Sequence, residues 1–526
     1  MKKILLALAI ALIQMITFAQ APAIEWQKAL GGTSNEQANS VQPTPDGGYI
    51  VSGYTTSSDG DVTGYHGGSS LCGSFGQYYC PNNDAWIMKL DATGAVVWQK
   101  AMGGTGIDSA QSILPTSDGG YIMVGNAKSN NGDLSGINLG GEAWIVKLDA
   151  TGTIVWQKLL AGYGPSGSGN ARAYSIQSTP DGGYYVAGMI TPYYTNRWVA
   201  KINSSGSIQW QNSYAGISYD YLFSIQTTAD NGYITAGQTN SNIPGQAGTV
   251  IGYHGNGDVY VGKVGMFNTD IHWEKALGGT STDQANSIQS TSDGGYIMAG
   301  YTYSTDGDVT GNHGGQDAWV VKLSATGDLV WQKTLGGTGS DLANSIQSTS
   351  DGGYLVAGST SSNNGDVTVN HGGSDAWIVK LDATGSPLWQ KTIGGTNSDN
   401  ATSIQLASDG GYIVGGYTSS NDGDVTGNHG GGDAWVIKIG SELSTSNFSV
   451  HDELKLYPNP AKSIVYLQTA TNASMDKIKI TDLSGKVILI QTINTTQVNI
   501  EPLASGLYII EAFSGVEKYM SKFIKE

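Results

Sequence analysis

Positive charge is scarce in this chain. Only two of its 526 residues are arginines, Arg172 and Arg197, and 26 basic residues face 43 acidic ones, which gives a formal net charge of −17 at pH 7. Proteins that bind nucleic acid present clustered lysine and arginine to the phosphates. The composition therefore argues against nucleic acid as a partner and describes a soluble surface that attracts cations.

Long apolar runs are confined to the N-terminus. Lys2 and Lys3 precede an apolar stretch over residues 4–18, and small residues suited to cleavage follow near Ala19. This pattern predicts a secretory signal peptide over residues 1–19. No later stretch reaches the roughly 18 apolar residues that a membrane helix needs. We therefore expect no transmembrane segment and a mature chain that lies outside the inner membrane.

Cysteine is almost absent, with Cys72 and Cys80 as its two copies. No Cys-His metal spacing, phosphate loop or Ser-His-Asp arrangement is found in the sequence. In an exported protein, two cysteines this close in sequence are expected to form a disulfide with each other.

Glycine and aromatic residues are plentiful instead, and they recur at fixed spacing. Charged residues make up only 13% of the chain, whereas it has 76 glycines, 28 tyrosines and 13 tryptophans, a composition typical of turn-rich all-β structure. The tetrapeptide Asp-Gly-Gly-Tyr or its variant Asp-Asn-Gly-Tyr begins at Asp46, Asp118, Asp181, Asp230, Asp293, Asp351 and Asp409. Trp followed by Gln or Glu occurs at Trp26, Trp98, Trp156, Trp210, Trp273, Trp331 and Trp389. Seven repeat units follow from these two marks.

Each unit contains four short segments that favour strands. In one unit they cover residues 344–349, 353–360, 376–381 and 388–393, and tight Gly-containing turns join the first to the second and the third to the fourth. Four antiparallel strands repeated seven times predict a seven-bladed β-propeller over residues 20–440. The strand order resembles that of a WD40 propeller, although the usual Gly-His and Trp-Asp pairs are absent.

The register of the repeat predicts how the ring closes. The repeat region opens with a strand around Trp26 and stops after a third strand at residues 434–439, so each end lacks what the other has. We expect residues 25–30 to supply the outer strand of the last blade, which pairs both free edges. In the alternative register, Trp26 begins a blade of its own and the ring closes by packing alone.

The C-terminal part of the chain differs in composition from the repeats. After a linker at residues 441–450, residues 451–526 carry Leu456-Tyr457-Pro458-Asn459-Pro460, then Asp482 with Gly485 and Lys486, then Gly506 and Tyr508, and a closing basic strand. This tail resembles a type A C-terminal sorting domain of the type IX secretion system of Bacteroidetes. The resemblance implies a small immunoglobulin-like β-sandwich that directs the chain through the secretion machinery to the cell surface or the exterior.

The long connection between the second and third strands is the candidate metal site. Its fullest copies read Ser-x-Asp-Gly-Asp-Val-Thr-Gly-Asn-His-Gly-Gly, and their acidic pairs are Asp59 with Asp61, Asp306 with Asp308, and Asp422 with Asp424. Closely spaced carboxylates around a glycine are suited to Ca²⁺, which takes six to eight oxygens, so Ca²⁺ is the one candidate cofactor. The alternative is that each aspartate caps its own loop by accepting bonds from backbone amides.

Other recurring polar residues are expected to be structural. Chemistry needs one site, whereas the loop histidine occurs in five copies: His66, His254, His313, His371 and His429. The connections between blades add Glu36, Asp108, Asp220, Asp283, Asp341 and Asp399, interpreted as loop caps. The tryptophans keep fixed strand positions, which favours packing between blades over sugar stacking.

Two functional classes remain open. The favoured one is a noncatalytic binding or adhesion propeller, with a glycan or a protein as the unknown ligand. The other is an extracellular polysaccharide-cleaving enzyme with its site in the central channel. The atypical third and fourth units contain Arg172, Arg197, Tyr193, Tyr194 and Tyr219, which are the candidates for a site unique to one part of the ring.

Overall fold

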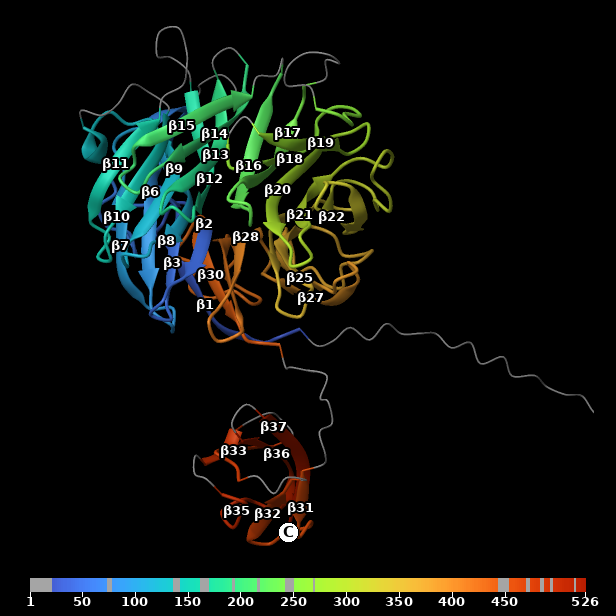
Figure 1. The fold of residues 1–526 in the computed structure, drawn as a ribbon. Coiled ribbons are helices and arrows are strands. Elements are labelled where there is room, and N and C mark those ends of the chain that lie inside the picture. The colour runs from blue at the N-terminus through green and yellow to red at the C-terminus, as the bar shows by residue number, and fades with distance from the viewer. Residues whose placement is uncertain are drawn as a thin grey trace, which may run out of the picture. The chain divides into compact units, whose positions relative to one another are not determined.

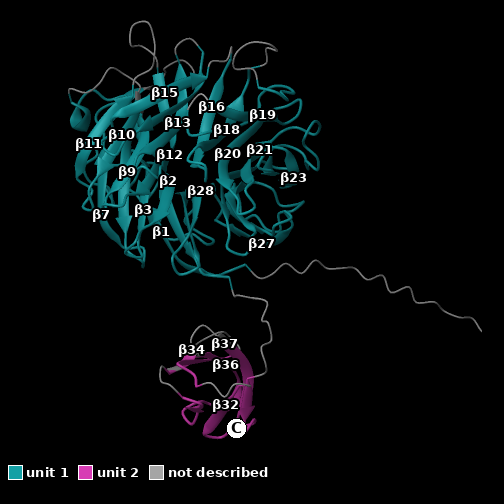
Figure 2. Cartoon of the chain, in the orientation of Figure 1, with its two compact units in different colours: residues 1–442 teal, residues 443–526 magenta. Residues whose placement is uncertain are grey.

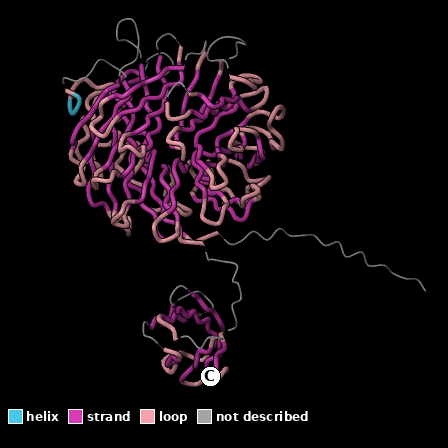
Figure 3. Tube along the Cα trace, viewed as in Figure 1, coloured by secondary structure: helices cyan, strands magenta, loops and turns pink. Residues whose placement is uncertain are grey.

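The computed structural model describes residues 21–442 except 73–77, 136–141, 161–169, 192–193, 215–217, 242–249 and 268–269, and residues 454–526 except 470–473, 483–486, 492–494 and 515–516. The predicted signal peptide lies outside these residues. The chain divides into two compact units, residues 1–442 and residues 443–526 (Figure 2). Nearly all of the described chain is strand or loop, and its helix is limited to the 3-10 turn η1 (Gly132–Leu134) (Figure 3). Within the part described, no helix is long and apolar enough to cross a membrane.

The first unit is a ring of seven four-stranded antiparallel sheets, which confirms the predicted propeller (Figure 1). Blade 1 contains β2 (Glu36–Pro43), β3 (Tyr49–Thr55), β6 (Asp84–Leu90) and β7 (Val96–Met102), and blade 2 contains β8 (Asp108–Pro115), β9 (Tyr121–Ala127), β10 (Glu142–Leu148) and β11 (Ile154–Leu160). Blade 3 contains β12 (Asn170–Ser178), β13 (Tyr184–Thr191), β14 (Asn196–Ile202) and β15 (Ile208–Tyr214), and blade 4 contains β16 (Asp220–Thr227), β17 (Tyr233–Thr239), β18 (Asp258–Val264) and β19 (Ile271–Leu277). Blade 5 contains β20 (Asp283–Ser290), β21 (Tyr296–Thr302), β22 (Asp317–Leu323) and β23 (Leu329–Leu335), and blade 6 contains β24 (Asp341–Ser348), β25 (Tyr354–Thr360), β26 (Asp375–Leu381) and β27 (Pro387–Ile393). Blade 7 contains β28 (Asp399–Leu406), β29 (Tyr412–Thr418), β30 (Asp433–Ile439) and the N-terminal strand β1 (Ile24–Leu30).

The ring closes by strand pairing, as the favoured register predicts. β1 runs antiparallel to β30, with Trp26 opposite Lys438 and Leu30 opposite Ala434. Figure 1 shows the N-terminal strand, in blue, beside the orange strands of the last blade. The alternative register, in which Trp26 begins its own blade, is wrong.

The Asp-Gly-Gly-Tyr motif makes the turn between the first two strands of each blade. In blade 6, the Gly353 amide donates to Asp351 Oδ1 at 3.1 Å, and Gly352 has φ +82°, which glycine adopts without strain. Lys380, which is buried in the third strand, places its Nζ 2.7 Å from Asp351 Oδ2. This ion pair, the Thr349 hydroxyl and the Gly353 amide together lower the pKa of Asp351 to about 2, although burial opposes them. The motif therefore both turns the chain and neutralises a buried lysine.

The tryptophans form the packing of the blades. Those of the third strands are buried, and in blade 6 the Trp377 indole donates to Gln390 Oε1 on the outer strand at 2.9 Å. Outer-strand tryptophans reach the next blade: Trp26 lies edge-on to Tyr49 at 5.8 Å and donates to the Ala92 carbonyl. None of the described tryptophans is among the exposed large side chains, because those of the third strands are buried and those of the outer strands are buried or half-buried.

The second unit is a small β-sandwich, as the tail's resemblance implies. One sheet contains β31 (Lys455–Tyr457), β32 (Ile464–Gln468) and β35 (Gln497–Asn499), and the other contains β33 (Lys477–Thr481), β34 (Val487–Gln491), β36 (Gly506–Ser514) and β37 (Glu517–Lys525). Val465 and Val498 of the first sheet share one apolar core with Ile480 and Ile510 of the second. Alternate residues of each strand point into this core.

Candidate functional site

The long loops and the connections between blades meet at each blade-to-blade junction. The acidic pairs bind the connection that enters their own blade. In blade 5, Asp306 Oδ1 accepts the Thr280 amide at 2.8 Å, and Asp308 Oδ2 accepts the Gly278 amide at 3.1 Å. The amide and hydroxyl of Thr280 lower the pKa of Asp306.

The other two acidic pairs make the same contacts. The carboxylates of Asp59 and Asp422 accept the amides of Thr33 and Thr396, both at 2.8 Å. Asp61 and Asp424 accept the amides of Gly31 and Gly394 at 3.2 and 3.4 Å. All six candidate metal ligands are therefore engaged as acceptors of backbone hydrogen bonds.

Two blades show that these loops fold with less charge. Asn364 stands where the fullest copies have the first aspartate, and its Oδ1 accepts the Thr338 amide at 2.9 Å. Asn131 accepts the Thr105 amide in the same way. A neutral side-chain amide thus accepts the same backbone bond as the carboxylate. Among the described residues, no group of three or more Asp, Glu, His or Cys side chains is placed to hold a metal ion. The contacts favour loop capping over Ca²⁺, which remains a prediction to be tested.

Calcium titration separates the two hypotheses. We expect neither chelation nor added Ca²⁺ to change the melting temperature of the propeller, and we expect Asp306→Asn to be neutral because asparagine already caps the loop at Asn364. Asp306→Ala removes the acceptor and should cost about 1 kcal/mol. If the free energy of unfolding instead rose by about 2.7 kcal/mol at a hundredfold excess of Ca²⁺ over its Kd, and if Asp306→Asn abolished that rise, the loop would be a metal site.

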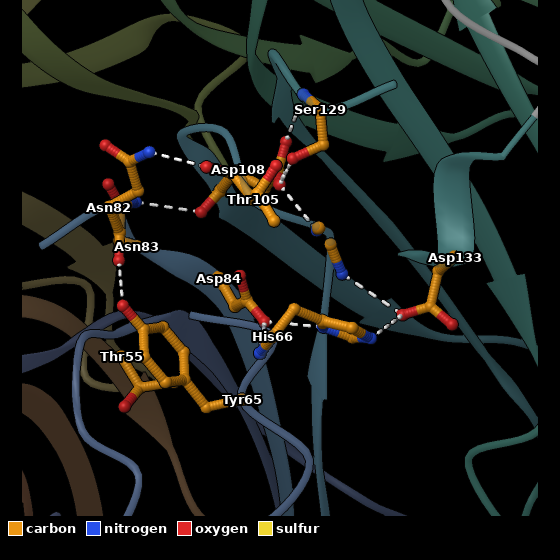
Figure 4. Close-up of polar contacts among 12 residues, drawn as sticks. Thr55, Tyr65, His66, Asn82, Asn83, Asp84, Thr105, Asp108, Ser129 and Asp133 are labelled. Atoms are coloured by element: carbon orange, nitrogen blue, oxygen red, sulfur yellow. Dashed lines mark hydrogen bonds and ion pairs between the residues drawn. The ribbon is translucent and has the colours of Figure 1, made fainter. Parts of the chain in front are cut away.

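The loop histidines connect neighbouring blades. In Figure 4 the His66 ring lies between two aspartates: Nδ1 is 2.7 Å from Asp84 Oδ2 in its own blade, and Nε2 is 3.7 Å from Asp133 Oδ2 in the next. His313 bridges Asp317 and Asp366 in the same way, and His429 bridges Asp433 and Asp61 across the closure of the ring.

An open groove of about 500 Å³ lies between the outer parts of blades 1 and 2, and His66, Lys100 and Asp133 are among its lining residues. The histidine resembles a general base held by an aspartate. However, the same His-Asp pair recurs at His254, His313, His371 and His429, which indicates a clamp between blades rather than one reaction centre.

The innermost strands line the central channel. Each neighbours the next around the ring, and each has a β-bulge at the same position. The residue at the bulge reaches the next blade: the side chains of Asn39, Asn286 and Asn344 donate to the backbone carbonyls of Ala110, Ala343 and Ala401 at 2.8 to 2.9 Å. A bulge re-aims a side chain, and here it turns a polar one into the channel wall.

Blades 3 and 4 break this polar pattern. Their bulge residues are Tyr174 and Phe223, whose ring centres lie 5.3 Å apart, and Phe223 stacks on Tyr221 at 5.7 Å. Arg172 precedes Tyr174 on the same strand and is exposed, while the three rings are half-buried. We call these four residues the channel patch. Only Arg172 is among the residues expected from the sequence; Tyr174 and Phe223 stand out because the bulge residues of the other five blades are polar, and Tyr221 occupies the position of Arg172 in blade 4.

The other candidates from the atypical blades have different surroundings. Arg197 is buried, with its guanidinium 3.7 Å from the centre of the Tyr260 ring and 3.4 Å from Glu274 Oε1, so it belongs to the packing between blades 3 and 4. Tyr194 and Tyr219 are exposed, and Tyr193 lies outside the described residues.

The disulfide prediction falls partly outside the described residues. β4 (Ser69–Cys72) and β5 (Tyr78–Pro81) form a hairpin that pairs Cys72 with Tyr78 and Cys80 with Ser70. The two cysteines are therefore on neighbouring strands but not directly opposite. Their side chains are not described, and the disulfide remains a prediction.

The predicted sorting motifs occupy two kinds of place in the second unit. Asn459 fixes the last strand, because its Oδ1 accepts the Ile524 amide at 2.9 Å, and Tyr508 stacks on Phe523 in the core. Tyr457, Pro458 and Pro460 are exposed, whereas Gly506 and Asp482 are half-buried at a strand end. Gly485 and Lys486 lie outside the described residues. The part that each residue plays in sorting stays a prediction.

Residues 455–526 match the family described as a secretion system C-terminal sorting domain. This agrees with the type IX sorting domain identified from the sequence motifs. The chain is accordingly exported to the cell surface or secreted.

The repeat region has more distant similarities. The chain is 30% identical over 186 residues to the Regulatory protein FlaEY of Caulobacter vibrioides, a match that spans 32% of this chain and 19% of the relative. The extracellular domain of the putative hybrid two component system BT4673 from B. thetaiotaomicron is 11% identical, with a TM-score of 0.41 over 96% of this chain and 60% of that one. The Neurospora crassa Pan2 WD40 domain is also 11% identical, with a TM-score of 0.43 over 78% of this chain and 95% of that domain.

Proposed function

We propose that this protein is a noncatalytic binding propeller of the cell surface or the extracellular medium, and that its ligand, a glycan or a protein, contacts the channel patch. The observation that carries the proposal is the break in the repeat at blades 3 and 4. The other five bulge positions all carry polar residues, and three of these are asparagines bonded to the next blade. A stable ring does not need aromatic rings and an arginine there.

The chemistry of the channel patch suits recognition. Half-buried aromatic rings offer apolar faces to a sugar ring or an apolar side chain, and they lose little conformational entropy on binding. Arg172 adds one of the chain's two guanidinium groups beside them, in a molecule of net charge −17. Arginine and tyrosine are enriched among residues that dominate binding energy.

The enzymatic alternative receives less support. Cleavage of a glycosidic bond by hydrolysis uses a pair of carboxylates flanking the bond. The acidic residues that begin the innermost strands, such as Asp108, Asp283 and Asp341, are fully buried at the blade junctions, away from the channel. None of the four residues of the channel patch has a carboxylate side chain.

Paired substitutions at equivalent positions test the proposal. Arg172→Ala and Tyr221→Ala should each weaken binding at least about tenfold on a glycan and protein array, because truncated hot-spot residues cost 2 kcal/mol or more. Leu342 occupies the position of Arg172 in blade 6, so Leu342→Ala is the matched control and should leave binding unchanged. Equal binding by all three variants would remove the channel patch as the site.

A further inference from the structure

Five blade junctions contain a buried aspartate with one oxygen that has no partner. These residues begin the third strands: Asp84, Asp258, Asp317, Asp375 and Asp433, each 0% exposed. In every case Oδ2 accepts the backbone amide of the loop histidine and also lies beside its Nδ1. For Asp317, the amide of His313 is 2.9 Å from Oδ2 and Nδ1 is 2.7 Å from it. In every case Oδ1 has no hydrogen-bond partner among the described residues. A carboxylate oxygen buried without a donor is costly.

A second buried acid of the next blade lies beside each of these aspartates, because its backbone amide donates to the carbonyl of the residue before the aspartate at 2.6 to 2.7 Å. The pairs are Asp84 with Asp108, Asp258 with Asp283, Asp317 with Asp341, Asp375 with Asp399, and Asp433 with Glu36. The glycine of the connection shows how close they are: a Cβ atom on Gly394 would lie 2.6 Å from Asp375 Oδ1 and 2.7 Å from Asp399 Oδ2. The equivalent Cβ on Gly31 would lie 3.0 Å from Asp433 Oδ1 and 2.4 Å from Glu36 Oε2. In these two pairs the carboxyl groups therefore flank the same point.

The two junctions that blade 3 makes with its neighbours have a single acid at this point. Asn196 begins the third strand of blade 3 and takes the place of the unpartnered aspartate beside Asp220, whose amide donates to the Thr195 carbonyl as the Asp108 amide does to Asn83. Asparagine has the shape of a protonated aspartic acid and can donate where the acid would. At the preceding junction the sequence has Glu142 followed by Ala171, again one acid.

We propose that each of the five pairs binds one proton, which sits on the unpartnered Oδ1 and is donated to the facing carboxylate. The proton converts the orphan acceptor into a donor, removes one of two like charges, and leaves Oδ2 as the acceptor for the histidine. No covalent bond other than O–H changes. The five sites together make the contacts between blades depend on pH.

The charged groups around one pair show why one proton is needed. The junction of blades 5 and 6 contains a third carboxylate besides those of Asp317 and Asp341. This is Asp366, whose Oδ2 lies 3.8 Å from His313 Nε2. Asp341 is already satisfied by the Gly337 amide and the hydroxyls of Thr360 and Ser362. Three carboxylates therefore surround one histidine, and a proton on the pair reduces the like charge that is buried there.

The direction of the effect follows from the pKa. Burial raises the pKa of Asp84 and Asp317 above the ordinary value, and it raises that of Asp258 to about 6. These five aspartates therefore hold protons more tightly in the folded ring than in the unfolded chain. Their stabilisation is fully present below the ordinary pKa of 3.8 and is lost as the pH rises through their raised pKa values, which for Asp258 is about 6. We expect the ring to be more stable at pH 5 than at pH 8.

Two opposite substitutions in the full mature chain test the proposal. Asp317→Asn replaces the protonated acid by its neutral isostere, so it should raise the melting temperature at pH 8, shrink the difference between pH 5 and pH 8, and abolish about one proton of uptake in a potentiometric titration. Asn196→Asp creates a sixth pair beside Asp220 and should lower the melting temperature at pH 8 more than at pH 5. Val330→Ala, at an exposed position of the outer strand β23 and away from the junction acids, is the control for both.

Other outcomes overturn the proposal. If Asp317→Asn lowers the melting temperature equally at both pH values, the carboxylate is needed in its charged form. If added Ca²⁺ raises the melting temperature of the wild-type chain at pH 8 and Asp317→Asn abolishes that rise, the pair holds a metal ion instead of a proton. If Asn196→Asp leaves the pH dependence unchanged, pairing of acids at a junction does not bind protons.

Discussion

Deletion of residues 21–30 is expected to destabilise the whole propeller. The deletion removes β1 and leaves β30 as an unpaired edge in the last blade. The deletion also removes the buried side chains of Ala29 and Leu30 from two apolar clusters of the ring. The Trp435 indole loses its acceptor, Gln27 Oε1. Lost apolar burial and a lost strand ladder together should reduce the free energy of unfolding by on the order of 5 kcal/mol.

Thermal and denaturant unfolding of the purified mature chain measures this effect. Gln27→Ala is the matched control, because it removes one side-chain bond and keeps the strand, at a cost of about 1 kcal/mol. We also expect the deleted protein to associate, since the exposed edge of β30 offers unpaired backbone groups to another chain. An unchanged melting temperature with monomeric protein would contradict closure by pairing.

Removal of residues 443–526 is expected to abolish surface exposure while leaving the propeller folded. The truncation falls between the two compact units, each with its own apolar core. Glu442 is retained because its carboxylate accepts the Trp389 indole at 3.1 Å and the Tyr412 hydroxyl at 2.8 Å. The truncated protein should therefore keep its melting temperature and accumulate in the periplasm.

Surface labelling and cell fractionation provide the measurement. Residues 443–526 fused to a periplasmic reporter should carry the reporter outside the cell, which shows that the tail is sufficient. Ile510→Ala, which opens the apolar core, and Tyr457→Ala, at an exposed motif residue, separate the fold of the sorting domain from its motif. Surface exposure of the truncated propeller would show that the address lies in the repeats.

Much of the fold was predictable because its determinants are local. The Asp-Gly-Gly-Tyr turn depends on an aspartate and on glycines one and two positions after it, so its strands follow from sequence alone. Counting these turns gives the number of blades. The register of the first and last repeats then predicts the pairing of β1 with β30, although more than 400 residues separate them, because each end has the strand that the other lacks.

The candidate site was less predictable because its contacts cross between blades. Tyr174 and Phe223 meet at 5.3 Å although they belong to different repeat units. The sequence placed acidic residues in the loops and in the connections, but both were interpreted as isolated caps. Which acid faces which depends on how two blades pack, and no periodicity within one blade contains that information.

The sequence by itself determined the seven repeats, the closure of the ring and the sorting tail, since turn chemistry, strand alternation and short motifs act over a few residues. Only the tertiary structure decided that His66 would bridge Asp84 and Asp133, that Asp84 would face Asp108, and that the channel wall would turn aromatic at blades 3 and 4. Burial at a junction removes the water that would otherwise solvate these groups, and it is this loss of solvent that makes the pairing of their charges matter.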